Sequence, residues 1–130
     1  MNARQILSVA AFIGAFSVAA GAFGAHGLKK IFSPEILQTF ETAVRYEFYH
    51  VFALLIVGML LLNRDEKLFR LSALFFLSGI MLFSGSLYLL CVVKWKEMAG
   101  WYWLGAITPF GGVCFIAGWL FLMAGILKRN

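Results

Sequence analysis

Charged residues are scarce in this sequence. Asp, Glu, Lys and Arg make up 13% of its 130 residues, whereas hydrophobic residues make up 62%. Soluble domains contain roughly 25% charged and 45–50% apolar residues. Several apolar runs here reach the ~20 residues that a helix needs to cross about 30 Å of hydrocarbon. A soluble bundle of this composition would expose large apolar patches and aggregate. The composition therefore predicts a single all-α membrane domain over residues 1–130.

Motifs of the common catalytic sites are missing. The sequence has no H-E-x-x-H zinc motif, no G-x-S-x-G nucleophile turn and no glycine-rich phosphate loop. Gly21 and Gly24 are the glycines most similar to such a loop, but they lie inside an apolar run rather than after a strand. We therefore expect no enzymatic activity, no catalytic residue, no metal site and no resident cofactor.

Cysteines are also few. Cys91 lies near the end of one apolar run, and Cys114 lies about a third of the way into the next. At about 1.5 Å per residue, the depths of the two residues in the membrane differ by roughly 10 Å, which is too far for a disulfide. We expect two free, buried core cysteines.

The formal charge of +5 is the usual reason to consider nucleic acid as a partner. Here the basic residues occur singly or in pairs at the ends of apolar runs, which suits lipid headgroups. No stripe of Lys and Arg interleaved with aromatic residues is present. The pattern predicts membrane lipid as a partner and no nucleic acid, and it leaves open a second copy of the chain or another membrane protein.

Four apolar runs are predicted to span the membrane, at about residues 5–25, 46–62, 71–93 and 104–127. The polar turn from Asn63 to Lys67 is short enough to force the next helix to run antiparallel. The aromatic and basic connection before the fourth run is typical of the headgroup level. The sequence therefore predicts an antiparallel four-transmembrane-helix bundle.

The second run follows an amphipathic segment at residues 34–45 with no break between them. Ser33 can cap the helix, Pro34 suits its first position, and Glu35 complements the positive end of the helix dipole. We predict an interfacial helix segment that continues into the bilayer near Tyr46.

Small residues indicate the faces on which these helices should pack, because they let two helices approach closely in lipid. In the first run two glycines are one heptad apart, and in the fourth run three glycines repeat every seven residues. The predicted helix-packing glycines are Gly14, Gly21, Gly79, Gly85, Gly111, Gly118 and Gly125.

Basic residues in the loops set the orientation of a membrane protein. One side would hold six of them: Arg4, Arg64, Lys67, Arg70, Lys128 and Arg129. The other side would hold five: Lys29, Lys30, Arg45, Lys94 and Lys96. This small excess favours cytoplasmic termini, and the near tie leaves dual insertion open.

The most polar segment that could enter the bilayer runs from Arg45 to His50 and includes Tyr46, Glu47 and Tyr49. His26 ends the first run and His50 begins the second, so we expect both near the same membrane surface. Ionisable groups in or near lipid are costly unless they are paired, which makes this group a candidate site. We favour an interhelical polar clamp that fixes the first span against the second. The alternatives are an ion-handling cluster, or a haem or quinone site through His26 and His50.

Polar residues in the third and fourth runs fit packing better than transport. Ser84 and Ser86 would bond their own backbone or a neighbouring helix, and Thr108-Pro109 would mark a helix boundary rather than a transporter-like broken helix. Runs one, three and four have no ionisable residue in their centres, which argues against a proton-coupled antiporter. A dimeric channel that uses these hydroxyls and backbone carbonyls remains an alternative.

Four stretches of the sequence resemble one family: Ala22 to Leu28, Thr42 to His50, Leu82 to Tyr88, and Gly105 to Gly112. It is the small membrane-protein family catalogued as domain of unknown function 423, whose animal relatives include transmembrane protein 256. The resemblance covers nearly the whole chain and implies a bacterial inner-membrane protein of about four spans without an established activity. Glu47 stands where an amide such as Gln would be expected. The motif positions to test are His26, Arg45, Tyr46, His50, Ser84, Ser86, Thr108 and Pro109.

Together these observations predict a non-catalytic accessory or interaction protein of the bacterial inner membrane. A small homo-oligomeric ion channel or transporter is the first alternative. A haem- or quinone-binding membrane protein is the second.

Overall fold

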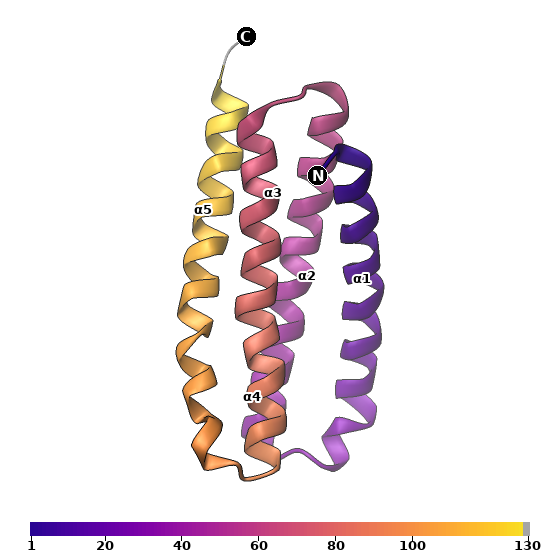
Figure 1. Cartoon of the computed structure of the whole chain (residues 1–130). Coiled ribbons are helices and arrows are strands. Elements are labelled where there is room, and N and C mark those ends of the chain that lie inside the picture. Colours follow the sequence, from indigo (N-terminus) through magenta and orange to yellow (C-terminus); the bar gives the residue numbers. More distant parts are fainter. Residues whose placement is uncertain (129–130) are drawn as a thin grey trace.

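Residues 1–128 are described by a computed structural model, and they form four long antiparallel helical segments (Figure 1). Each segment has 28 to 30 residues, so it is about 42–45 Å long and matches a bilayer with its headgroup layers. This confirms the predicted all-α membrane bundle. The elements are α1 (Ala3–His26), η1 (Leu28–Lys30), α2 (Pro34–Asn63), α3 (Lys67–Gly79), η2 (Ile80–Ser84), α4 (Gly85–Trp95), η3 (Ala99–Ala106) and α5 (Thr108–Leu127).

The amphipathic segment at residues 34–45 forms the first turns of α2. Ser33 caps the helix by accepting a hydrogen bond from the backbone N–H of Ile36, and Pro34 occupies the first turn. The segment runs along α4: the Lys94 ammonium pairs with Glu35 at 2.8 Å, and the Cys91 thiol donates to the Ile36 carbonyl. These turns therefore belong to the wall of the bundle.

The third and fourth segments are not uniform α-helices. A π-helical turn, η2, joins α3 to α4 where the sequence predicted an uninterrupted helix. The 3-10 helix η3 precedes α5, and Pro109 lies in the first turn of α5, as expected for a helix boundary. Both cysteines are free, but only Cys91 is buried; Cys114 is half-buried, contrary to the prediction.

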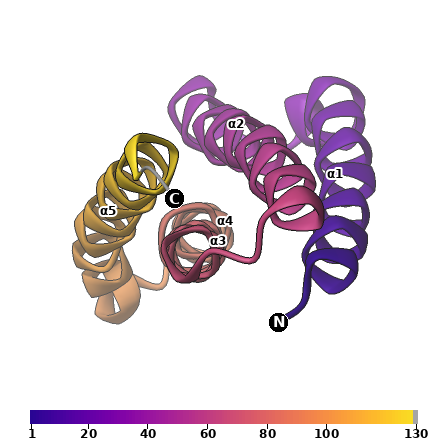
Figure 2. The ribbon, with the colours of Figure 1, turned by 90° about the horizontal axis from the view of Figure 1, so that it is seen from above.

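Two helix pairs share the centre of the bundle. α1 packs on α2, and α5 packs on α3 and η2, while α2 joins the two pairs by packing on α3, η2 and α4. Seen from above, α1 and α5 lie at opposite ends of the layout (Figure 2). α1 begins and α5 ends at the same end of the bundle (Figure 1). α1 packs mainly on α2, and hollows remain between α1 and the α3–η2–α4 segment.

Aromatic and branched side chains fill the interior. Phe69, Phe76, Phe115 and Leu122 interleave with residues of α1 and α2 in one continuous core. Close packing of this kind is what large side chains achieve in protein interiors. The centre of the single chain is therefore a packed core rather than an open pore.

Most of the glycines predicted to pack do lie against a neighbouring helix. A Cβ atom at Gly111 would come within 2.4 Å of the Phe83 backbone nitrogen, the closest approach to another backbone. Gly85 is the exception, because its nearest neighbour is the Ile80 carbonyl of its own segment at 4.0 Å. Neighbouring helices lie within 3.6 Å of a Cβ at Gly14, Gly21, Gly79, Gly111, Gly118 and Gly125.

Candidate functional site: a buried carboxyl group beside a lateral groove

Glu47 lies near the middle of α2 and is only 2% exposed. At 1.5 Å per residue it is about 20 Å from the start of this helix and about 24 Å from its end. The sequence led us to expect this segment close to the membrane surface. In the structure residues 34–45 are the first turns of α2, so Glu47 and His50 lie near the middle of this helix and of the bundle rather than at an end.

Three helices meet at the Glu47 carboxyl group. The Ser17 hydroxyl on α1 donates to Oε1 at 2.7 Å, and the Tyr88 hydroxyl on α4 donates to Oε2 at 2.8 Å. The ion pairs found within residues 1–128 use Glu35, Asp65 and Glu66, not Glu47. This is the geometry that the clamp interpretation requires, although the carboxyl group meets neutral hydroxyls rather than a cation.

A groove runs between α1 and the η2–α4 side of the bundle, next to Glu47. It consists of a hollow of about 260 Å³, which Glu47 borders, and a larger hollow of about 450 Å³ toward η1. Phe16 and Tyr88 line both hollows and join them. We call these two hollows the lateral groove. Its aromatic lining residues are Phe12, Phe16, Phe23, Phe32, Phe40 and Tyr88.

The lateral groove opens on the outer surface of the bundle, where Phe12 at its edge is 76% exposed. Inside the groove the rings contact each other: Tyr88 meets Phe16 edge-on at 6.1 Å and Phe40 at 5.1 Å between ring centroids. A molecule could therefore enter from the side and meet aromatic rings first and the carboxyl group last.

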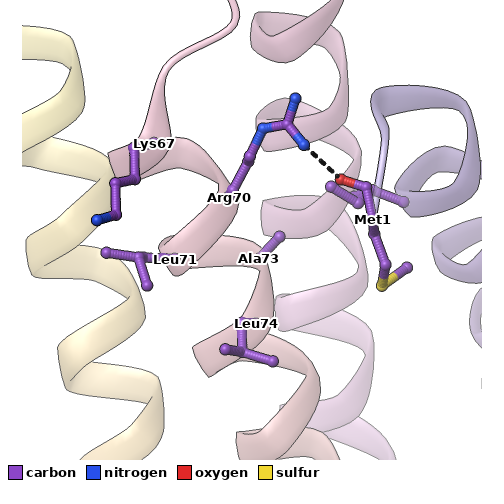
Figure 3. A pocket seen from close by; sticks show the side chains of 7 residues that line it. Met1, Lys67, Arg70, Leu71, Ala73 and Leu74 are labelled. Atoms are coloured by element: carbon purple, nitrogen blue, oxygen red, sulfur yellow. Dashed lines mark hydrogen bonds between the residues drawn. The ribbon is translucent and has the colours of Figure 1, made fainter.

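A separate hollow of about 300 Å³ lies nearer the end of the bundle where α1 begins (Figure 3). There Arg70 of α3 donates to the Met1 carbonyl at 3.3 Å and forms a two-point pair with Asp65. Figure 3 shows the Arg70 side chain reaching across to Met1, whereas Lys67 points the other way. Arg70 thus ties α3 to the residues that lead into α1.

His50 occupies a different buried site, facing α5. Its Nδ1 lies 2.7 Å from the Tyr46 carbonyl, and the Trp119 indole N–H donates to Nε2 at 3.3 Å. A carbonyl can only accept and an indole can only donate, so these partners select the neutral tautomer with its proton on Nδ1. The ring also stacks on Phe115 at 3.4 Å. With both nitrogens occupied, His50 has no lone pair free for a metal.

His26 does not lie near His50. It is exposed at the end of α1, and the register of α1 on α2 is fixed by Gly24 against Phe40 and Ser17 against Glu47. This register places His26 level with residue 38 of α2, so the levels of the two histidines differ by roughly 18 Å. The alternative in which His26 and His50 hold one haem iron therefore does not fit this structure, and residues 1–128 contain no cluster of three or more metal-ligating side chains.

The remaining predicted residues take separate places. Arg45 and Tyr49 are exposed, and Arg45 is not among the ion pairs of the described chain. Arg45 lies about 16 Å along α2 rather than in a loop. Tyr46 stacks on Phe83 at 4.6 Å between ring centroids.

The hydroxyl groups of the third and fourth segments bind other protein groups. Ser84 donates to the Ala43 carbonyl at 2.8 Å, and Ser86 bonds Thr108 at 2.8 Å. In this fold they join helices and do not line a channel through the single chain.

Sequence reasoning missed three residues of these sites: Ser17, Tyr88 and Trp119. Ser17 is a small residue in an apolar run and looks like an ordinary packing residue, and Tyr88 stood out only as part of a stretch that resembles the family. Trp119 gave no signal, because an indole in an apolar run looks like any lipid-facing aromatic residue.

Comparison with known proteins adds the family. The chain matches the family described as "Protein of unknown function (DUF423)" over residues 20–112. It is 41% identical over 127 residues to a "UPF0382 membrane protein" of Haemophilus influenzae, covering 98% of this chain and 97% of the relative. It is 35% identical over 128 residues to the "UPF0382 inner membrane protein YgdD" of Escherichia coli K12, covering 98% and 93%. No solved structure shows significant similarity. The chain therefore belongs to the DUF423 family, whose bacterial relatives are named UPF0382 membrane proteins.

Proposed function

We propose that this protein is a non-catalytic interaction protein of the bacterial inner membrane, and that it takes a lipophilic small molecule from the bilayer into the lateral groove. One observation carries the proposal: an aromatic groove that opens on the outside of the bundle ends at a buried carboxyl group. Ligand sites are typically hollows of ~300–1,000 Å³ with apolar walls and few polar groups. The larger hollow, about 450 Å³, falls in that range.

The size and chemistry of the groove favour a small molecule over the other occupants of a membrane. One turn of a helix 10 Å across takes up roughly 400 Å³, so a partner helix would exceed the hollow within little more than a turn. A saturated lipid chain offers no group that could interact with Glu47 or favour aromatic rings over any other apolar surface.

Photolabelling with a neutral aromatic diazirine tests this proposal. The full-length protein in nanodiscs should carry adducts on peptides that line the groove, around Ala19 and Tyr88. Ala19→Trp would fill the larger hollow of the groove and should reduce this labelling severalfold. Val18→Trp is the matched control, because Val18 is 60% exposed and lies about 100° further round α1. If the outer face of α5 is labelled as strongly as the groove, and Ala19→Trp changes neither, the proposal is contradicted.

Transport of the bound molecule is the second candidate function. The sequence argued against a proton-coupled antiporter because the first, third and fourth runs have no ionisable residue in their centres, and it kept a channel or transporter as the first alternative. Glu47, half-way along α2, supports this candidate because ionisable residues inside membrane bundles are often part of substrate pathways. Liposomes that contain the protein should then release a trapped substrate, and Glu47→Gln should stop the release. Liposomes that stay tight with the native protein would end this candidate.

We also keep the prediction that both termini are cytoplasmic. Arg4, Arg64, Lys67 and Arg70 are near the bundle end where α1 begins, and Arg129 lies outside the described residues. Arg45 no longer counts as a loop residue of the opposite side, because it lies about 16 Å along α2. A reporter enzyme that is active only in the cytoplasm, fused after Asn130, should be active. If the fusion protein is abundant but its reporter is inactive, the C-terminus lies on the opposite side of the membrane.

A further inference from the structure

We infer that the ligand of the lateral groove is a lipophilic organic cation, with the Glu47 carboxylate as its counter-charge. This inference rests on the proposed function and specifies the chemical class of the ligand. It follows from the surroundings of Glu47, the walls of the groove, and the small number of oxygen atoms that the site offers.

The Glu47 carboxylate has hydrogen bonds but no opposite charge. Ser17 and Tyr88 each donate one bond, from neutral hydroxyl groups. A carboxylate buried without a cation is costly in an apolar surrounding, even when hydrogen bonds satisfy part of its demand. A positive ligand in the adjoining hollow would compensate this charge directly.

The walls of the groove suit a positive ligand. The rings of Phe12, Phe16, Phe40 and Tyr88 border it, and aromatic faces attract cations, most strongly where water is excluded. Among the described residues that line the two hollows there is no Lys, Arg or His. Lys94, three residues beyond Cys91, is already paired with Glu35 at 2.8 Å.

The cation must be organic rather than a bare metal ion. Hard metal ions such as Ca²⁺ need about six to eight oxygen ligands. Within residues 1–128 the site offers one carboxyl group and two hydroxyl groups, and no cluster of three metal-ligating side chains exists. An organic cation whose charge is surrounded by apolar substituents does not need these oxygen ligands.

Equilibrium binding of tetraphenylphosphonium to the full-length protein in nanodiscs tests this inference. The native protein should bind tetraphenylphosphonium at least tenfold more tightly than tetraphenylborate, which has a similar shape and the opposite charge. Glu47→Gln should weaken the binding of the cation at least tenfold. Glu41→Gln removes the same charge from an exposed position of the same helix and should leave the affinity unchanged.

A second variant guards against misfolding of Glu47→Gln. Ala19→Trp fills the larger hollow of the groove, which Ala19 lines and Glu47 does not, and should weaken cation binding severalfold, whereas Val18→Trp should not. Equal binding of the two ions, or full affinity in folded Glu47→Gln protein, would overturn the inference. If the neutral diazirine labels the groove but the cation does not bind there, the inference fails and the proposed function stands. If neither probe enters the groove, both fail.

Discussion

The hydroxyl of Tyr88 on α4 donates a 2.8 Å hydrogen bond to the Glu47 carboxylate on α2, across 41 residues of sequence. Hydrogen bonds to charged groups contribute about 1.5–3 kcal/mol. Tyr88→Phe keeps the ring that lines the groove and removes only the donor, so it should lower the free energy of unfolding by about that amount. Denaturant unfolding in mixed micelles measures the change. Tyr49→Phe, at a side chain that is 55% exposed, is the control and should be neutral. Equal effects of the two variants would contradict the assigned bond.

The contact of Gly111 with the Phe83 backbone gives a second prediction. A Cβ at Gly111 would be 2.4 Å from the Phe83 nitrogen, so Gly111→Ala must push α5 away from η2 and lower the melting temperature. Gly112→Ala meets nothing within 4 Å and should be neutral or stabilising, by up to about 1 kcal/mol, because alanine favours a helix more than glycine does. If both variants melt at the same temperature, α5 does not pack as described.

The buried His50 site predicts a coupling between two residues. His50→Ala removes the ring that stacks on Phe115 and leaves the Trp119 N–H without its acceptor. It should cost about 2–4 kcal/mol of unfolding free energy, because it combines a cavity with an unsatisfied donor. In a double-mutant cycle with Trp119→Phe, the two changes should show a coupling of about 0.5–3 kcal/mol. His26→Ala, at an exposed position, should stay within about 0.5 kcal/mol of the native protein. If the effect of the double variant equals the sum of the effects of the two single variants, the two residues do not interact.

Glu66 predicts a dependence of stability on pH. Its carboxylate accepts a hydrogen bond from the Lys128 ammonium at 3.0 Å, and this bond holds the pKa of Glu66 below its usual value. The folded state then binds the Glu66 proton less readily than the unfolded state does. This stabilisation is present above the unfolded pKa and is lost as the pH falls through the lowered folded pKa.

Comparing the native protein with Glu66→Gln checks that dependence. The native protein should have the higher melting temperature near pH 7, and the difference should shrink as the pH falls below 4.5, the ordinary pKa of a Glu side chain. A difference that stays constant over the whole pH range would mean that the charge of Glu66 does not matter.

Local sequence signals predicted the helices well. Ser33 and Pro34 start α2 because capping and first-turn preferences depend on adjacent residues only. The glycine repeat in α5 predicted its packed face for the same reason, since residues seven apart lie on one side of a helix. The π-helical turn η2 gave no such signal, because its residues are ordinary apolar ones.

The candidate site depended on distant residues and was predicted only in part. Glu47 stood out because a carboxyl group in an apolar segment is rare. Its partners, Ser17 and Tyr88, are 30 and 41 residues away and were not recognisable without the register of the helices. The depth of the site was also hidden, because an amphipathic start of a helix looks the same whether it lies on a membrane or in the wall of a bundle.

The most direct test of the account is competition between the two probes. Native protein in nanodiscs would be photolabelled with the neutral diazirine while tetraphenylphosphonium is added in increasing amounts, and adducts would be mapped by mass spectrometry. If the lateral groove is the ligand site, the cation should displace labelling around Ala19 and Tyr88 and leave the outer face of α5 unchanged. In Glu47→Gln protein the neutral probe should still label the groove, but the cation should no longer displace it. If a saturating amount of the cation does not reduce labelling of the groove in the native protein, the groove is not the cation's binding site.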